Sequence, residues 1–185
     1  MIIPVNDMSR SPASENLELA LVELLQKKAY KCISVSELSE LAGVSRQAFY
    51  LNYRDKDALL SRLLSKLFAD IMGVVDSMHV DTVESLVSVY TEIVEKYSGF
   101  MKILADNDLG AFLNRAFVDE LVKRAPVLKI QKEPESRDER LYINSFWVSA
   151  FTDVYTVWLK NGMHTPKDEL NSILADIMTG RYFSK

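Results

Sequence analysis

Apolar residues recur at helical spacing along most of the chain, and no stretch of useful length alternates as a strand would. From Val83 to Tyr97, apolar residues stand at offsets 0, 3, 4, 7, 10, 11 and 14. Similar stripes predict further helices over 13–29, 56–78, 99–106, 109–124, 138–161 and 165–179, with two short helical pieces between 33 and 53. The pattern therefore predicts an all-α fold of about nine helices.

Composition limits the class of protein further. The chain has 185 residues, 48% of them hydrophobic, and a net charge of −4, which suits one folded domain or two small ones. Cys32 is the one cysteine and has no internal partner for a disulfide, so we expect a reducing, cytoplasmic setting and a buried thiol. The first residues lack the basic segment of a signal peptide. The longest charge-free apolar-rich stretch, Leu141 to Thr152, is too short for a membrane span.

Residues 33–56 predict two short helices joined by a tight turn. Ser34 and Glu37 have the spacing of a capping box, which starts the first helix. Gly43 offers the left-handed conformation that ends it. Ser45 then caps a second helix after about three turn residues. Two helices joined so tightly cross steeply, which is the helix-turn-helix arrangement.

The second short helix carries side chains suited to DNA. Phe49 and Tyr53, four residues apart, face the core, which leaves Arg46 and Gln47 at a polar N-terminal end. Arginine can pair with guanine and glutamine with adenine in the major groove. Phosphate contacts are expected from Ser34, Tyr50 and Lys56. Tight helix pairs also occur in proteins that bind no nucleic acid, and residues 1–60, with seven basic and eight acidic groups, are not a basic domain.

The stretch from Leu41 to Leu60 resembles the N-terminal signature of the TetR family of bacterial transcription regulators. The resemblance rests on Ala42-Gly43-Val44-Ser45, Phe49-Tyr50, Tyr53, Asp55-Lys56-Asp57 and Leu59. It implies a DNA-binding set of Ser34, Ser45, Arg46, Gln47, Ala48, Tyr50, Asn52 and Lys56. Ser39 and Asn52 depart from the family pattern, in which a small alanine and a histidine or tyrosine are usual at these positions.

The resemblance also implies the organisation of the chain. Residues 1–55 would bind double-stranded DNA, and residues 56–185 would bind an unknown small-molecule effector and form a homodimer. The expected function is a ligand-responsive regulator on a near-palindromic operator, with repression as the family default. The segment Trp158-Leu159-Lys160-Asn161-Gly162 resembles a subgroup that includes regulators of dihydroxyacetone kinase genes.

Aromatic residues in the C-terminal half indicate where an effector would bind and where two subunits would meet. The candidate effector pocket consists of Tyr90, Phe100, Phe112, Phe146, Phe151 and Asp153. The helix over 141–159 is apolar almost all round, so it should bury two faces. The candidate dimer interface consists of Trp147, Val154, Val157, Trp158, Leu170, Ile173 and Ile177. A plain packed core is the alternative for each of these residues.

Other classes of function find little support in the sequence. Two histidines and one cysteine, far apart, provide no metal site, and no nucleophile–base pair is evident, so we expect no metal, no cofactor and no catalysis. A transcriptional activator, an adaptor whose C-terminal half binds a protein, and a helical enzyme stay as alternatives. Gly73, inside the predicted 56–78 helix, marks either close packing or a hinge that couples ligand to DNA.

Overall fold

The structure, a computed structural model, describes residues 12–78, 80–123, 134 and 136–183. All regular secondary structure in these ranges is helical, which confirms the predicted all-α class and about nine helices. The elements are α1 (Pro12–Leu25), the 3₁₀ turn η1 (Tyr30–Cys32), α2 (Val35–Leu41), α3 (Arg46–Asn52), α4 (Lys56–Ser77), α5 (Val83–Lys96), α6 (Ser98–Asp106), α7 (Gly110–Leu121), α8 (Arg137–Lys160) and α9 (Lys167–Met178).

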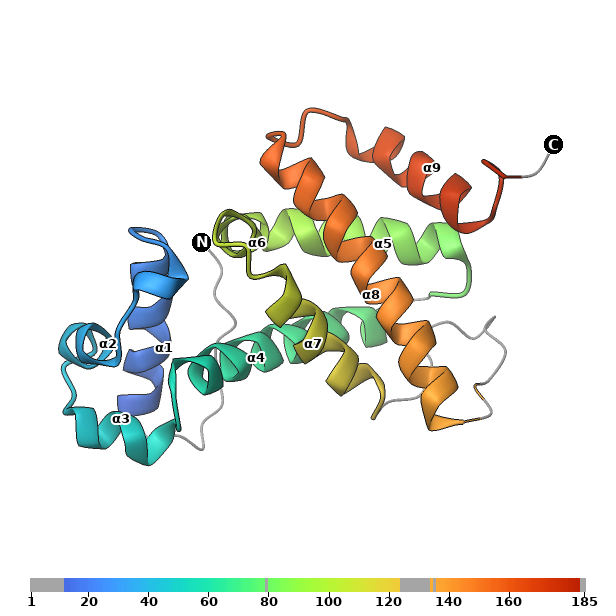
Figure 1. The fold of residues 1–185 in the computed structure, drawn as a ribbon. Coiled ribbons are helices and arrows are strands. Elements are labelled where there is room, and N and C mark those ends of the chain that lie inside the picture. The colour runs from blue at the N-terminus through green and yellow to red at the C-terminus, as the bar shows by residue number, and fades with distance from the viewer. Residues whose placement is uncertain (1–11, 79, 124–133, 135, 184–185) are drawn as a thin grey trace.

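Helices α1, α2 and α3 form a small unit at one end of the molecule (Figure 1). Each of the three helices contacts the other two. Their shared core is fully buried and contains Leu17 and Leu21 from α1, Leu38 from α2 and Phe49 from α3. Because these helices are short, tertiary packing of this kind rather than helix propensity holds them in place.

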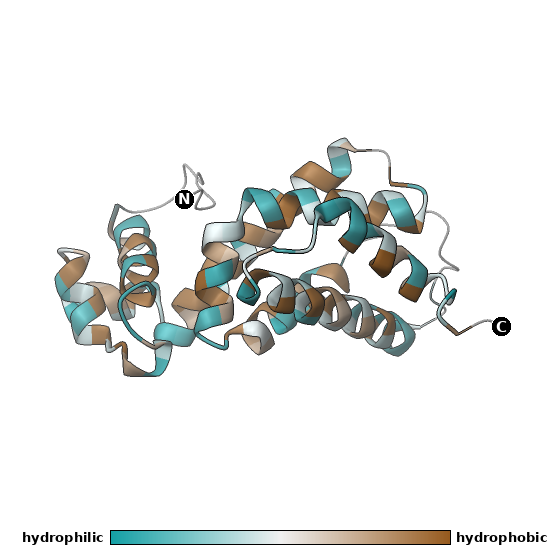
Figure 2. Ribbon diagram, turned by 90° about the horizontal axis from the view of Figure 1, so that it is seen from above, coloured by the Kyte–Doolittle hydropathy of each residue, from teal (hydrophilic) through white to brown (hydrophobic). Residues whose placement is uncertain are grey.

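Helix α4 runs from this unit into the rest of the molecule (Figure 1). It begins at Asp55, whose side chain accepts a hydrogen bond from the amide of Ala58 at 2.8 Å. One face carries a row of fully buried leucines, and Figure 2 shows the apolar and polar segments that alternate along such helices. Burial of this row explains why so long a helix forms without a break.

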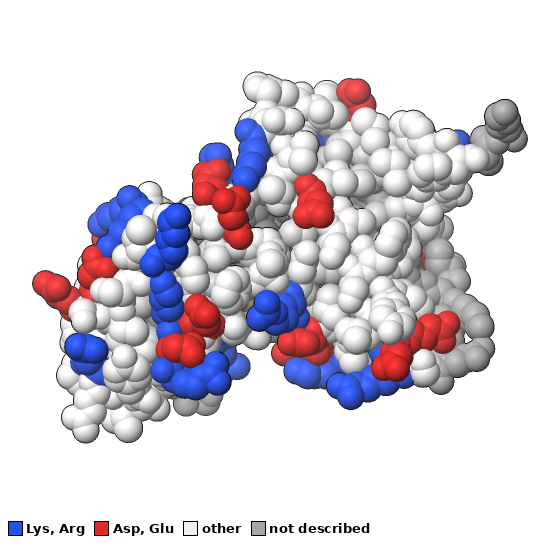
Figure 3. Space-filling model, in the orientation of Figure 1, with Lys and Arg blue, Asp and Glu red and all other residues white. Residues whose placement is uncertain are grey.

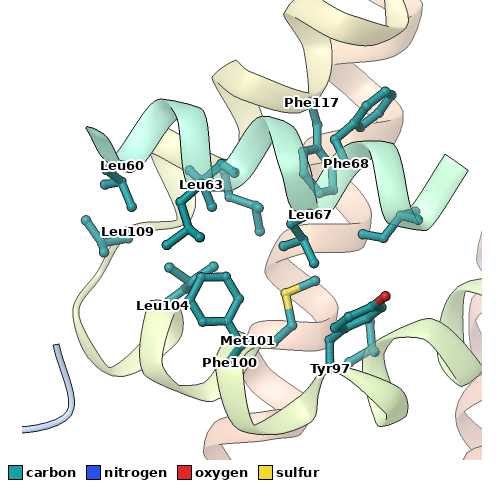
Figure 4. Close-up of a cluster of buried hydrophobic side chains, with 14 of the residues drawn as sticks. Leu60, Leu63, Leu67, Phe68, Tyr97, Phe100, Met101, Leu104, Leu109 and Phe117 are labelled. Atoms are coloured by element: carbon teal, nitrogen blue, oxygen red, sulfur yellow. The ribbon is translucent and has the colours of Figure 1, made fainter. Parts of the chain in front are cut away.

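The remaining helices pack around the far part of α4. Helix α7 lies between α4 and α8, α6 packs on α8, and α9 packs on α5 (Figure 1). In the buried cluster of Figure 4, leucines of α4 such as Leu63 and Leu67 face Phe100 and Leu104 of α6. Phe68 of α4 meets Phe117 of α7 edge to face, with ring centroids 5.2 Å apart. No helix in the described ranges is long and apolar enough to cross a membrane.

Several local predictions were wrong. The first helix stops at Leu25 rather than near 29, and Cys32 is exposed rather than buried, because it ends η1 at the surface. Helix α9 begins at Lys167 rather than at the predicted residue 165. Close packing at Gly73 is also wrong, because no described atom outside its own stretch of α4 lies within 4 Å of where a Cβ would stand.

Candidate nucleic-acid interface and ligand cavity

The turn between α2 and α3 has the geometry that the sequence predicts. Gly43 adopts a φ of +67°, a conformation that glycine reaches without steric cost. The amide of Val44 then donates to the carbonyl of Ser39 at 2.9 Å, which closes the end of α2. The Ser45 hydroxyl accepts a hydrogen bond from the amide of Ala48 at 3.0 Å and so caps α3. The two helices therefore form the predicted helix-turn-helix pair.

Helix α3 has one buried and one exposed side. Phe49 is fully buried and Tyr53 is nearly so. Arg46 and Gln47 are exposed on the first turn, and among the described residues neither makes a hydrogen bond or an ion pair. Tyr50 projects from the next turn with 53% of its surface exposed. The first two turns of α3 thus present donors and acceptors that nothing in this part of the chain occupies.

Three other predicted DNA-contact residues have structural roles as well. Ser45 uses its hydroxyl as the helix cap. Ala48 is half-buried, with its carbonyl accepting a hydrogen bond from the Asn52 side-chain amide at 2.7 Å. Asn52 is exposed at the end of α3. A small residue at Ala48 leaves room for close approach to a base edge, whereas Asn52 points part of its amide back to its own helix.

The start of α2 lies beside η1 and is held by a capping box. The amide of Ser34 donates to a carboxylate oxygen of Glu37 at 3.0 Å, and the Ser34 hydroxyl accepts from the amide of Glu37 at 3.3 Å. Lys28 forms an ion pair with the same carboxylate. The Lys28 ammonium and the Ser34 donors lower the pKa of Glu37 to about 2. Ser34 stays exposed at the N-terminus of α2, where helix amides favour a phosphate.

Lys56 occupies a position that the sequence did not reveal. Its ammonium donates to the backbone carbonyls of Tyr30 at 2.9 Å and Ile33 at 3.0 Å. The same nitrogen lies 4.5 Å from the centre of the Tyr30 ring. Lys56 therefore fastens the start of α4 to η1, whatever contact it makes with a phosphate. No sequence spacing signals these carbonyl contacts, because they join residues more than twenty positions apart.

Charge on this unit is mixed, as the counts of the sequence indicate. Both signs are visible over α1–α3 in Figure 3. Lys27 pairs with Glu23, Lys28 with Glu37 and Arg54 with Asp55. Ion pairs neutralise these cations, so a strong, sequence-independent attraction to phosphate is not built into this surface.

A buried polar network holds α3 against its neighbours. The Tyr53 hydroxyl lies 2.6 Å from the Ser14 hydroxyl and donates to a carboxylate oxygen of Glu18 at 3.0 Å. Glu18 also forms an ion pair with Lys66 of α4, and both side chains are largely buried. The orientation of α3 is thereby tied to α1 and α4.

A cavity of about 350 Å³ opens between the C-terminal half of α8 and helices α5, α6 and α7. Of the predicted pocket residues, Tyr90 and Asp153 line it. Phe151 stands directly behind, with its ring centroid 4.6 Å from that of Tyr90. Tyr155 lines the cavity from the aromatic group of α8, and Asn114, Thr152 and Lys160 line it although none of the three was predicted. Polar positions inside an otherwise apolar helix could have indicated Thr152, whereas nothing in the pattern marked Asn114.

Three predicted pocket residues lie elsewhere. Phe100 is fully buried in the cluster against α4 (Figure 4). Phe112 packs edge to face on Tyr30, with ring centroids 5.9 Å apart. Phe146 projects to the surface with 67% exposure. Helical spacing does not show on which side of α6, α7 or α8 the cavity forms. For this reason the predicted set includes aromatic residues that do not line the cavity.

The predicted dimer residues separate into two groups. Trp158 and Leu170 are buried within the chain itself, and the indole nitrogen of Trp158 donates to the carbonyl of Thr165 at 2.9 Å. Val157 and Ile177 are exposed. Trp147, Val154 and Ile173 are half-buried.

The exposed side of α8 carries more apolar surface than the predicted set. Tyr142 and Phe146 stand on the same side as Val157, at helical spacing, and are exposed by 71% and 67%. Figure 3 shows few charged side chains over the middle of α8, with charged groups gathered near its two ends. A hollow of about 310 Å³ lies between Val157, Trp158 and Leu170 on this side. We call the exposed residues Tyr142, Phe146 and Val157 the apolar face.

Within the ranges that the structure describes, no three residues of the types that bind metal ions gather at one point. Burial raises the pKa of Tyr155 to about 12, and desolvation raises that of Tyr90 further, so both phenols are neutral at ordinary pH. Neither is poised as a base.

Comparison with known proteins gives a consistent result. Residues 19–63 match the family described as bacterial regulatory proteins, tetR family, and residues 81–180 match a transcriptional regulator C-terminal region of the same group. Two HTH-type transcriptional regulators of Bacillus subtilis (strain 168) are similar in part: YwcC is 37% identical over 82 residues and YvkB 26% identical over 85 residues. These alignments cover 43% and 46% of this chain, and only 37% and 45% of the two relatives.

Solved structures share the fold over most of the chain. The fatty acid degradation regulator FadR from Bacillus halodurans matches with a TM-score of 0.64 at 14% identity, covering 96% of this chain and 100% of FadR. The repressor AlkX from Dietzia sp. matches with a TM-score of 0.54 at 17% identity, covering 89% and 92%. Identities this low show a common fold and nothing of the ligand. Since the C-terminal region model alone spans more than half of the chain, the chain belongs to the TetR family of bacterial regulatory proteins.

Proposed function

We propose that this protein is a ligand-responsive transcriptional regulator that binds a near-palindromic operator as a homodimer in the cytoplasm. Residues 1–55 would bind DNA, and residues 56–185 would bind the effector and form the dimer. The observation that supports this most is the exposed side of α3, where Arg46 and Gln47 have no partner in the described chain while Phe49 fixes the opposite side in the core. A major groove admits a helix of this kind.

The DNA contacts follow from this arrangement. Arg46 and Gln47 would read base edges beside Ala48, and Tyr50, Asn52 and the N-terminus of α2 at Ser34 would hold phosphates. Because most cations of the unit are paired, we expect affinity to depend on base contacts more than on charge. Lys56 would contribute to phosphate contacts only from a position already fixed by the carbonyls of η1.

A second copy of the chain is the proposed occupant of the apolar face. Phe146 and Val157 would be covered by the same residues of the partner, as a two-fold interface requires. The hollow between Val157 and Leu170 offers room for a side chain of the partner subunit. A dimer of this kind would set two α3 helices about one DNA turn, ~34 Å, or a little more apart.

Repression by occupying a promoter is the proposed mode of regulation. One structural neighbour is a repressor, AlkX, and another is described as the dihydroxyacetone kinase operon activator DhaS, with a TM-score of 0.50 at 18% identity. At that identity the likeness is one of fold, so the resemblance of the Trp158–Gly162 segment to the DhaS subgroup stays a prediction.

Selection of bound sequences from random DNA tests the proposed function. The full-length protein should enrich duplexes with two related half-sites in inverted orientation. A reporter downstream of the enriched site should fall in expression when the protein is present, whereas a rise would identify an activator. Failure to enrich any sequence, with a folded dimeric protein, would contradict the proposal.

A further inference from the structure

The cavity beside α8 has a size and a lining that suit one class of small molecule. Its volume is about 350 Å³. A cavity of roughly 150 Å³ already accepts a benzene ring. The present one therefore has room for a ring with a short side chain. Its walls include apolar side chains such as Val94, Met101 and Leu113, so the body of the ligand should be apolar.

Charge around the cavity is unbalanced. Three charged side chains line it: Asp108, Asp153 and Lys160. Lys160 is already neutralised, because its ammonium lies 3.2 Å from a carboxylate oxygen of Asp108. Asp153 is exposed at the rim and has no ion-pair or hydrogen-bond partner among the residues described. One unpaired negative charge thus remains.

The ends of three helices also contribute to the electrostatic potential of the cavity. The C-terminal parts of α6 and α8 reach the cavity at Ala105 and Lys160, and the N-terminus of α7 reaches it at Gly110. The last carbonyls of α6 and α8 already accept backbone hydrogen bonds, so these two ends add only a small negative contribution to that of Asp153. The cavity as a whole therefore favours a cation over an anion.

Two buried polar groups of the lining are free to form hydrogen bonds with a ligand. The Asn114 side-chain oxygen and the Thr152 hydroxyl are buried and have no hydrogen-bond partner in the described chain. No hydrogen bond holds the Thr152 hydroxyl, so rotation of this side chain toward the cavity breaks nothing. The Tyr90 ring also lines the cavity, and a cation near such a ring is stabilised further.

We propose that this cavity binds a small monocationic amine with an apolar, ring-sized body, and that its ammonium group lies at Asp153 and the Tyr90 ring. The inference rests on the proposed function only in that such an amine would be the effector; the binding itself does not require DNA. An anion of the same shape would meet the Asp153 carboxylate instead of pairing with it and would be rejected.

Four probes of matched shape separate charge from apolar fit: 2-phenylethylamine, 2-phenylethanol, phenylacetate and ethylbenzene. Isothermal titration with the full-length protein should give binding of the amine at least ten-fold tighter than that of the alcohol. Phenylacetate should bind at least ten-fold more weakly than the alcohol. Equal binding of the amine and phenylacetate would overturn the proposal, as would absence of binding by all four at millimolar concentration.

Two variants test the assignment to Asp153. Asp153→Asn should bring the affinities for amine and alcohol to within about two-fold of each other, while Asp119→Asn, an exposed acid on α7 away from the cavity lining, should keep the wild-type ratio. An unchanged ratio in Asp153→Asn would overturn the assignment. Operator binding is measured on the same samples. If the wild-type protein binds its operator but not the amine, this inference alone is overturned. If it binds the amine tightly but binds no operator, the proposed function alone is contradicted.

Discussion

The side chain of Asn107 joins the turn after α6 to the backbone of Tyr30. Its oxygen accepts a hydrogen bond from the Tyr30 amide at 2.8 Å, and its nitrogen donates to the carbonyl of Leu25 at 3.1 Å. The next residue, Asp108, has a φ of +54° and lines the cavity. A ligand that moves this turn would therefore move the end of α1 and η1 directly, beside the longer route through α4.

The variant Asn107→Ala should loosen this junction. Loss of the acceptor for the Tyr30 amide, worth about 1 kcal/mol, should speed hydrogen exchange at that amide by roughly five-fold. A spin label on Cys32, the one cysteine and an exposed one, should also show a broader distance distribution between the two subunits. Lys102→Ala, on the exposed side of α6, is the control, and it should leave both the exchange rate and the distance distribution as in wild type. If Asn107→Ala changed neither the exchange rate of the Tyr30 amide nor the distances between the labels, Asn107 would not couple the cavity to the DNA-binding unit.

A charge on the apolar face should separate the subunits. We expect Val157→Glu to sediment as a monomer at micromolar concentration, because the glutamate would be buried against the same site of the partner. Leu19→Glu, at an exposed leucine on α1, should stay dimeric. A wild-type protein that sediments as a monomer, or a dimeric Val157→Glu variant, would place the interface elsewhere.

Substitution of Gly73 tests the hinge interpretation of α4. Because no described atom outside its own stretch of α4 lies within 4 Å of the added methyl group, Gly73→Ala should stabilise the fold by up to about 1 kcal/mol. The corresponding rise in Tm is about 2–4 °C. Gly180→Ala, at a φ of +77°, should show no such gain. If α4 bends at Gly73, the distribution of distances between the Cys32 spin labels of the two subunits should be narrower in Gly73→Ala than in wild type. A distribution as broad as that of wild type would exclude the hinge.

Ser39 should cost stability where it stands. It is 2% exposed, and its hydroxyl has no hydrogen-bond partner among the described residues. Ser39→Ala removes this buried group, so the free energy of unfolding should rise by about 1 kcal/mol. Ser36→Ala, exposed on the same helix, shares the gain in helix propensity but not the gain from the buried hydroxyl. If urea denaturation gave the same rise in the free energy of unfolding for both variants, the Ser39 hydroxyl would have a hydrogen-bond partner in solution.

Local signals in the sequence predicted much of the fold. The capping box at Ser34 and Glu37, the left-handed Gly43 and the cap at Ser45 are properties of neighbouring residues, and all three were confirmed. The two sides of α3 followed from the spacing of Phe49 and Tyr53. Such features depend only on residues a few positions apart, so the local sequence is enough to predict them.

Contacts between distant segments were not predictable in the same way. Asn107 meets Leu25 across 82 positions, and Lys56 meets the carbonyl of Tyr30 across 26. The cavity depends on which side of α8 turns toward α7, and the apolar residues of α8 are spread around the helix, so they give little information about that. For this reason Phe146 was assigned to the pocket, although it projects from the surface, and Trp158 to the dimer interface, although it is buried in its own chain.

If the exposed side of α3 reads DNA sequence, loss of the Arg46 side chain should weaken binding to the operator far more than binding to other duplexes. The affinity of wild type, Arg46→Ala and the control Arg137→Ala, at the exposed start of α8, is measured at one salt concentration for the selected operator and for a random duplex. Arg46→Ala should lose about 1–3 kcal/mol on the operator and far less on the random duplex, with Arg137→Ala near wild type on both. Equal losses on the two duplexes, or no loss on the operator, would contradict base reading by α3.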